Sequence, residues 1–153
     1  MGRGGIRVSA RARPGAHDWQ NQLEFAEYFA QRASLEKDGR DQNLVEARAG
    51  LARVIALVPE IPEGHAMLGI TYTIEGQPPE PGIDSLERAL ALLPSHPQIE
   101  YPLAQVHARA GHRDRAIELL RRVVHRAHAS SDPGAARQLE ELERAAGETR
   151  APN

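Results

Sequence analysis

The sequence overlays on itself at a shift of 35 residues, and this internal repeat limits what the chain can fold into more than any other feature. The equivalent positions include two prolines, a glycine and several leucines: Pro59 with Pro94, Pro62 with Pro97, Gly76 with Gly111, Leu51 with Leu86, Leu57 with Leu92 and Leu68 with Leu103. Internal periods of about 20 to 50 residues are typical of architectures that stack copies of one small unit. The sequence therefore predicts an array of similar units.

Each period contains apolar residues spaced by three or four positions, which predicts amphipathic helices and no strand. Prolines and glycines bound these segments, in keeping with the asymmetry of helix ends. We expect seven helices in antiparallel pairs, at about residues 19–39, 44–58, 62–76, 82–93, 95–111, 113–128 and 133–146. Pro102 lies inside the fifth helix, so this helix is expected either to kink or to begin near Tyr101. The prolines between Gln77 and Gly82 lengthen one turn.

The length of 153 residues suits a single domain. Residues 1–16 are rich in Arg, Gly and Ala without an apolar period, and we expect a disordered arm there. Residues 17–148 are expected to form one helical repeat domain, and residues 149–153 a disordered tail.

Composition excludes several classes of protein. The net charge of -2 and the hydrophobic content of 41% fit neither a highly charged disordered chain nor a strongly basic nucleic-acid binder. The absence of cysteine excludes disulfides and thiolate chemistry. No apolar run approaches the roughly 18 to 20 residues of a membrane span, and no secretory signal is visible. We therefore expect a cytoplasmic protein without membrane insertion. Lys37 is the single lysine, a composition that indicates a bacterial source.

Charge is distributed unevenly along the chain. Residues 17–100 carry 6 basic and 14 acidic side chains, whereas residues 101–128 carry 6 basic and 2 acidic ones. Opposite charges at the two ends favour a head-to-tail contact between copies, which the acidic last helix is placed to limit. We expect a monomer or a weak homo-oligomer.

The two clearer repeats share an order of large, small and turn residues. In the third pair the order runs Leu103, Ala104, His107, Gly111, Ala116, Leu120 and Val123, and in the second Leu68, Gly69, Tyr72, Gly76, Gly82, Leu86, Ala89 and Pro94. This order resembles the tetratricopeptide repeat, a two-helix unit of about 34 residues. The resemblance covers about residues 40–128 well and residues 18–40 loosely. It implies an all-α, right-handed α-solenoid of about three antiparallel helix pairs with a C-terminal capping helix.

The resemblance also implies a function, that of a non-catalytic scaffold or adaptor that binds a protein or peptide partner. In this family the concave surface is lined by the first helix of each pair. The matching positions form the expected peptide-binding groove: Phe29, Ala33, Glu63, Ala66, Ile70, Thr73, Ile74, Gln98, Tyr101, Gln105 and Arg109. An equally weighted alternative is that the capping helix or the long first helix fills this groove. Some relatives clamp the acidic tails of chaperones with basic groove residues. In this sequence the same positions hold uncharged residues, which disfavours the binding of acidic chaperone tails: Phe29, Ala33, Ile70, Tyr101 and Gln105.

Other functions leave weaker traces. An accessory region of a larger enzyme or secretion assembly is the second hypothesis. A small metal-dependent hydrolase is the third, and it requires His107, His112, His125 or His128 to converge with a carboxylate. No zinc, phosphate-loop or nucleophile motif occurs, so we expect no catalytic residue, no metal and no cofactor. The arginines at positions 3, 7, 11 and 13 have no aromatic neighbours, and the basic run 109–126 fits a solvated helix face; we expect no nucleic-acid partner.

Overall fold

The computed structural model of the protein describes residues 18–126 and 133–149, and over these ranges it contains seven helices and no strand. The helices are α1 (Asp18–Leu35), α2 (Arg40–Leu57), α3 (Pro62–Ile70), α4 (Glu80–Leu92), α5 (Pro97–Arg109), α6 (Arg113–Arg126) and α7 (Pro133–Thr149). The predicted all-α class and the predicted number of helices are confirmed. The predicted arm, residues 150–153 of the predicted tail, and His128 lie outside the described residues, whereas Thr149 belongs to α7.

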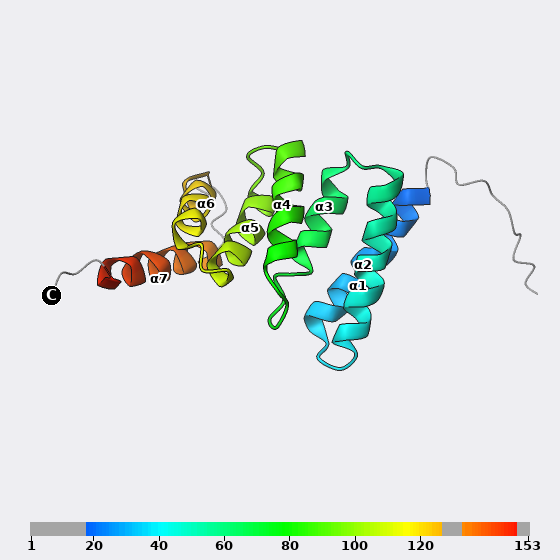
Figure 1. Cartoon of the computed structure of the whole chain (residues 1–153), viewed down its shortest axis with the longest axis horizontal. Coiled ribbons are helices and arrows are strands. Elements are labelled where there is room, and N and C mark those ends of the chain that lie inside the picture. The colour runs from blue at the N-terminus through cyan, green and yellow to red at the C-terminus, as the bar shows by residue number, and fades with distance from the viewer. Residues whose placement is uncertain (1–17, 127–132, 150–153) are drawn as a thin grey trace, which may run out of the picture.

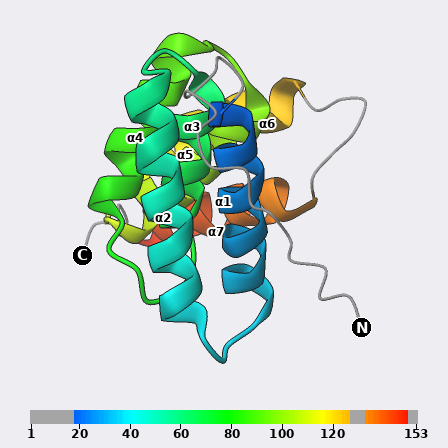
Figure 2. The same ribbon diagram turned by 90° about the vertical axis from the view of Figure 1, so that its right-hand side faces the viewer.

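Consecutive helices pack as hairpins, α1 with α2, α3 with α4 and α5 with α6, and α7 packs on α6. Neighbouring hairpins meet through α2 with α3, α4 with α5, and α3 with α5. Figure 1 shows the hairpins following one another along the long axis, from α1 and α2 at one end to α7 at the other. Viewed from the α1–α2 end in Figure 2, these two helices run side by side and antiparallel. This is the predicted solenoid.

Glycines turn the chain inside the second and third pairs. Gly76 has a φ of 87° and Gly111 a φ of 82°, a left-handed conformation that side chains disfavour. After α5, the backbone N–H of His112 donates to the carbonyl oxygen of His107, which closes the helix end around Gly111. The repeated glycine is thus explained by the repeated turn.

Several helix boundaries differ from the prediction. Helix α1 ends at Leu35 and α2 begins at Arg40, each four residues earlier than expected. Helix α3 ends at Ile70, well before Gly76, because the hydroxyls of Thr71 and Thr73 donate to carbonyl oxygens three residues back and stabilise a turn. Helix α5 begins at Pro97 and continues through Pro102, which removes only the hydrogen bond to the carbonyl group of Gln98 in the first turn. Helix α7 continues past the predicted stop before residue 147 to Thr149.

The hydrophobic core is concentrated in the helices from α4 to α7, which we call the C-terminal block. One cluster of buried residues joins these helices: Leu86, Ala89, Ile99, Leu103, Ala104, Val106, Leu119, Leu120, Val123 and Ala135. The hairpin of α1 and α2, which we call the N-terminal pair, buries a separate set: Ala26, Ala33, Leu44, Ala47, Leu51 and Val54. The fold therefore has one continuous core and one smaller, local one.

Small residues set the separation of the helices within each hairpin. A Cβ atom added at Gly69 of α3 would overlap the side chain of Leu86 and lie 3.1 Å from the carbonyl oxygen of Gly82. A Cβ atom at Gly82 would lie 2.8 Å from the Cβ of Tyr72. Glycine lets α3 and α4 approach closely, which is why small residues recur at these positions of the repeat.

A buried ion pair links α5 to α6. The carboxylate of Glu100 is fully buried and accepts hydrogen bonds from both terminal nitrogens of Arg126 at 2.6 and 3.0 Å. The Nε of Arg122 lies 3.6 Å from the same carboxylate. Bidentate hydrogen bonding of this kind offsets part of the free-energy cost of burying the charge. The repeat pattern contains no signal for this pair.

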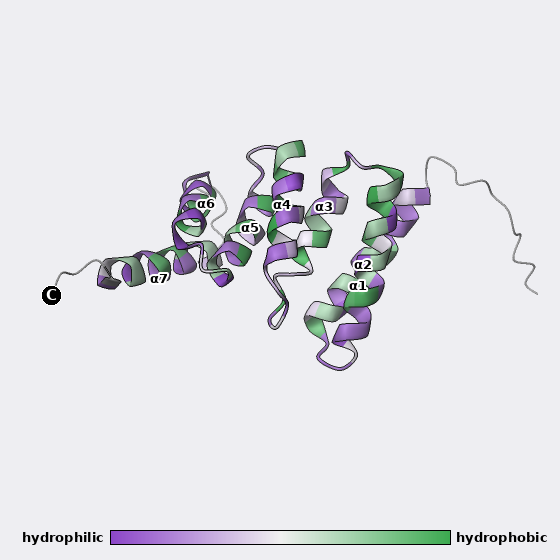
Figure 3. Ribbon diagram, viewed as in Figure 1, coloured by the Kyte–Doolittle hydropathy of each residue, from purple (hydrophilic) through white to green (hydrophobic). Residues whose placement is uncertain are grey.

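Hydrophobic and hydrophilic residues are interspersed along the helices, and in Figure 3 none is hydrophobic along its whole length. Within the described residues, no helix is both long enough and apolar enough to span a bilayer.

Candidate peptide-binding groove

An open groove runs between α1 and α3, and we call it the α1–α3 groove. It consists of two cavities of about 290 and 350 Å³ that share Glu27, Met67 and Ile70. The first cavity is also lined by Pro62, Glu63, Ala66, Leu93, His96, Gln98 and Ile99. The second is also lined by Ala30, Gln31, Ser34, Thr71, Thr73 and Ile74.

Helical spacing explains which residues line the two walls. Helix α1 contributes positions 27, 30, 31 and 34, and helix α3 contributes positions 63, 66, 67 and 70. Both sets follow the spacing i, i+3, i+4, i+7, which places side chains on one face of a helix. The groove is therefore bounded by two facing helix stripes.

The floor of the groove is apolar and its rim is polar. Ala66 and Ile70 pack against the main hydrophobic cluster, so the floor rests on the core of the C-terminal block. Met67, Leu93 and Ile99 add further apolar surface. Gln31, Ser34 and Gln98 are exposed around it. An apolar floor with a few polar groups at its edge is the usual character of a ligand site.

Two arginines hold the α3–α4 loop (residues 71–79) next to the groove. From α2, Arg48 donates to the hydroxyl of Thr71 at 3.0 Å and to the side chain of Gln77 at 2.9 Å, and its guanidinium lies 3.8 Å from the centre of the Tyr72 ring. From α5, Arg109 donates to the backbone carbonyl oxygens of Tyr72 and Gln77. Burial lowers the pKa of the Arg48 guanidinium, and the Tyr72 ring partly opposes this change. These contacts fix α2 relative to the end of α3.

Solved structures share this arrangement of helices. The tetratricopeptide domain of Sgt2 from Aspergillus fumigatus superposes with a TM-score of 0.72 and 16% identity, over 89% of this chain and 85% of that one. The first tetratricopeptide domain of Spaghetti (RPAP3), bound to the HSP90 peptide SRMEEVD, gives 0.65 and 14%, over 82% and 95%. An O-GlcNAc transferase mutant from Thermobaculum terrenum gives 0.68 and 21%, over 86% of this chain and 23% of the transferase chain. This chain thus spans about a quarter of the transferase.

Sequence comparison identifies the family. The profile of the tetratricopeptide repeat matches residues 82–145, from α4 into α7. Over this range the chain contains tetratricopeptide repeats. None of the curated proteins matches the sequence. Because the matched solved structures are less than 25% identical, they establish the tetratricopeptide fold and not its ligand.

Of the eleven residues predicted from the tetratricopeptide resemblance, a subset lines the groove: Glu63, Ala66, Ile70, Thr73, Ile74 and Gln98. The remaining five residues line neither of its cavities. Tyr101 packs against the main cluster, Gln105 is half-buried, and Arg109 binds the α3–α4 loop. The third helix pair was predicted to supply a wall of the groove. Of the described residues of α5 and α6, only Gln98 and Ile99 line the groove.

The predictions for α1 have the wrong helical register. Ala33 is fully buried, and its carbonyl oxygen accepts a hydrogen bond from Arg40 at 2.9 Å. Phe29 stacks edge-on with Phe25 at 4.8 Å between ring centres and with Tyr28 at 5.3 Å, on another face of the helix. The tetratricopeptide pattern is weak in the first helix, so it gave no reliable phase there. The residues of α1 that do line the groove, at positions 27, 30, 31 and 34, share the spacing i, i+3, i+4, i+7.

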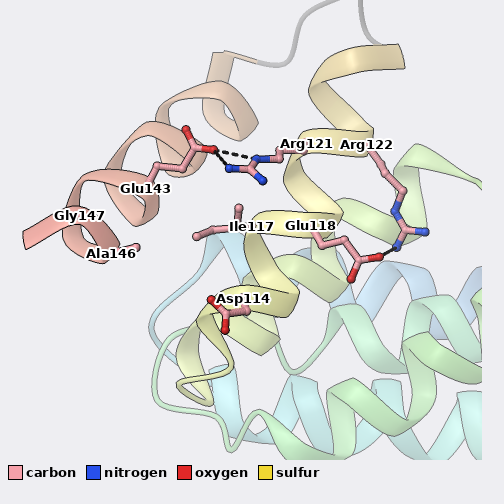
Figure 4. A pocket seen from close by; sticks show the side chains of 8 residues that line it. All are labelled: Asp114, Ile117, Glu118, Arg121, Arg122, Glu143, Ala146 and Gly147. Atoms are coloured by element: carbon pink, nitrogen blue, oxygen red, sulfur yellow. Dashed lines mark hydrogen bonds and ion pairs between the residues drawn. The ribbon is translucent and has the colours of Figure 1, made fainter. Parts of the chain in front are cut away.

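A larger cavity of about 700 Å³ lies between α6 and α7, where the tetratricopeptide stack ends. Figure 4 shows two ion pairs among its charged side chains, whereas Asp114 lies apart from them: Arg121 binds Glu143 at 2.6 Å, and Arg122 lies 3.7 Å from Glu118. Five of its eight lining side chains are charged. Because most of these charges are paired with one another and the lining is far more polar than that of the groove, this cavity is a poorer ligand site than the groove.

Two of the histidines that a metal-dependent hydrolase would require lie together at the end of α5, away from the groove. His107 Nδ1 lies 3.1 Å from His112 Nδ1, and its Nε2 lies 3.7 Å from the Glu87 carboxylate, so two histidines and a carboxylate do approach one another. They line none of the cavities described above. Among the described residues, no group of three or more His, Asp or Glu side chains is placed to hold a metal ion. Burial lowers the pKa of His107, an effect that Glu87 partly opposes.

Proposed function

We propose that this protein is a non-catalytic interaction module that binds a peptide segment of another protein in the α1–α3 groove. One observation carries the proposal: an open, apolar floor bounded by the facing stripes of α1 and α3. Exposed apolar grooves in soluble proteins are typical of binding sites for peptides and helices. The Spaghetti domain, a structural neighbour with a bound HSP90 peptide, supports the same class of function.

A matched pair of substitutions on α1 tests the groove. Gln31 and Asn21 both carry exposed amide side chains on α1, but only Gln31 lines the groove. Gln31→Trp is expected to fill the second cavity and abolish binding, whereas Asn21→Trp adds the same ring elsewhere. The experiment is selection from a displayed random-peptide library with the wild-type chain, followed by binding of the selected peptides to both variants. Equal binding by wild type and both variants would contradict the proposal.

A second candidate function is that of an accessory region in a larger enzyme. The observation that favours it is the match to the Thermobaculum O-GlcNAc transferase, of which this chain spans 23%. In that case the groove binds a segment of the enzyme's own substrate or of its other domains. The peptides selected as above should then resemble segments of the larger enzyme or of its substrate.

The proposal assigns the protein to the cytoplasm of a bacterium, with no nucleic-acid partner and at most weak self-association. The net charge of -2 and the acidic character of residues 17–100 support the lack of a nucleic-acid partner, and the single lysine supports the bacterial source. Light scattering at low and high salt measures the association, which should weaken as salt screens the exposed charges.

A further inference from the structure

We infer that the α1–α3 groove selects cationic amphipathic segments, in which a lysine or arginine side chain stands next to large apolar ones. This inference rests on the proposed function and specifies its ligand. The observation that carries it is the charge of the lining. Among the described residues that line the groove, Glu27 of α1 and Glu63 of α3 are the only Asp, Glu, Lys or Arg side chains, and they come from opposite walls.

Neither carboxylate has an ion-pair partner in the part of the chain that the structure describes. Both are exposed, and no ion pair found among the described residues includes Glu27 or Glu63. Two carboxylates on facing helices, over an apolar floor that excludes water once occupied, favour a cation between them.

The arginines of neighbouring elements are already engaged. Arg126 is paired with the buried Glu100, whereas Arg48 and Arg109 keep their charge but are directed toward neutral groups of the α3–α4 loop. The described lining of the groove itself carries two carboxylates and no Lys or Arg, in keeping with the excess of acidic residues over positions 17–100. A lining of this charge attracts cationic ligands and repels anionic ones.

The apolar part of the ligand is set by the floor. The two cavities adjoin at Met67 and Ile70, so a bound segment can place one large apolar side chain in each. Methionine adapts its shape to different apolar groups, which suits a site that accepts several sequences. An acidic tail such as SRMEEVD, the peptide bound by the Spaghetti domain, would instead bring carboxylates against Glu27 and Glu63. Like charges in contact oppose binding.

The test uses the full chain and a short amphipathic peptide of leucine, lysine and serine. Two matched peptides replace every lysine with glutamate or with glutamine. Isothermal titration at low salt should show binding of the lysine peptide, weaker binding of the glutamine peptide and none of the glutamate peptide. E27Q/E63Q should weaken binding of the lysine peptide by about five-fold, the effect of two exposed ion pairs. E140Q/E141Q, an equal change of charge on exposed residues of α7, should leave it unchanged.

The outcomes separate this inference from the proposed function. If the glutamate peptide binds as well as the lysine peptide, and Gln31→Trp abolishes both, the groove binds peptides but the charge preference is overturned. If Gln31→Trp leaves the binding of every peptide unchanged, the proposed function fails as well. The basic residues 1–16 are a competing occupant: tighter lysine-peptide binding by R3Q/R7Q/R11Q/R13Q would show that the chain's own arm fills the groove and would overturn the assignment to a partner.

Discussion

In the C-terminal block the buried apolar residues of four helices form one cluster, whereas the N-terminal pair buries its own set chiefly between α1 and α2. The block is also joined by the buried Glu100–Arg126 ion pair. The N-terminal pair joins the rest through the α2–α3 contact and through Arg48, and it leaves Phe25 and Tyr28 of α1 exposed. The groove lies where these two regions meet. The difference indicates that the C-terminal block supports the floor of the site, while the N-terminal pair, which shares less of the core, supplies one of its walls.

The largest expected effect is inside the C-terminal block. Glu100→Ala leaves Arg126 and Arg122 without their buried carboxylate, and we expect the free energy of unfolding to fall by about 3 kcal/mol. Chemical denaturation measures this change. Glu143→Ala, which breaks the exposed pair with Arg121, is the control and should cost less than about 1 kcal/mol. Equal losses would mean that burial does not distinguish the two pairs.

The next prediction compares the close contacts between helices in the two regions. Gly69→Ala forces a methyl group against Leu86 and the carbonyl oxygen of Gly82, and we expect a loss of about 2 kcal/mol. Gly50→Ala in the N-terminal pair meets only the Cβ of Ala26 at 3.1 Å, and we expect a loss below about 1 kcal/mol. Thermal melting curves of both variants show which substitution lowers the stability more. A larger loss for Gly50→Ala would show that the N-terminal pair is the more tightly packed region.

A smaller effect is expected where the regions are linked. Arg48→Met keeps the apolar stem but removes the hydrogen bonds to Thr71 and Gln77, and we expect a loss of roughly 1 kcal/mol. Hydrogen exchange should show faster opening of α1 and α2, with little change in α5 and α6. Uniformly faster exchange in every helix would contradict the division into two regions.

The smallest expected effect is a pH dependence that belongs to the C-terminal block. Burial lowers the pKa of His107 in the folded state, so the unfolded chain binds more protons at mildly acidic pH. The free energy of unfolding should therefore decrease as the pH falls below about 6.5. Denaturation curves between neutral and mildly acidic pH measure the slope, which His107→Gln should reduce. An unchanged slope in this variant would assign the pH dependence to other groups.

The repeat made the fold predictable because its prolines and small residues act locally. Pro62 and Pro97 begin helices, and Gly69 and Ala104 lie where neighbouring helices approach, so the repeat pattern located all seven helices, although several of their ends differ by up to six residues. The early end of α3 was missed because it depends on two threonine hydroxyls. The pairing of Arg48 and of Glu100 with distant residues has no periodic signal. On α3 the groove prediction largely matched the residues that line the cavities, but on α1 it had the wrong register, since the first pair departs most from the repeat.

Glu27 and Glu63 belong to the exposed rim, and neither forms an ion pair among the described residues. Substitutions at such positions usually change stability by less than about 0.5 kcal/mol. The residues that decide how the helices approach are a different set, to which Gly69 and Gly82 belong. If the groove has the proposed charge preference, this separation lets two substitutions reverse it while the scaffold stays intact. The choice of partner can then change independently of the packing that determines the architecture.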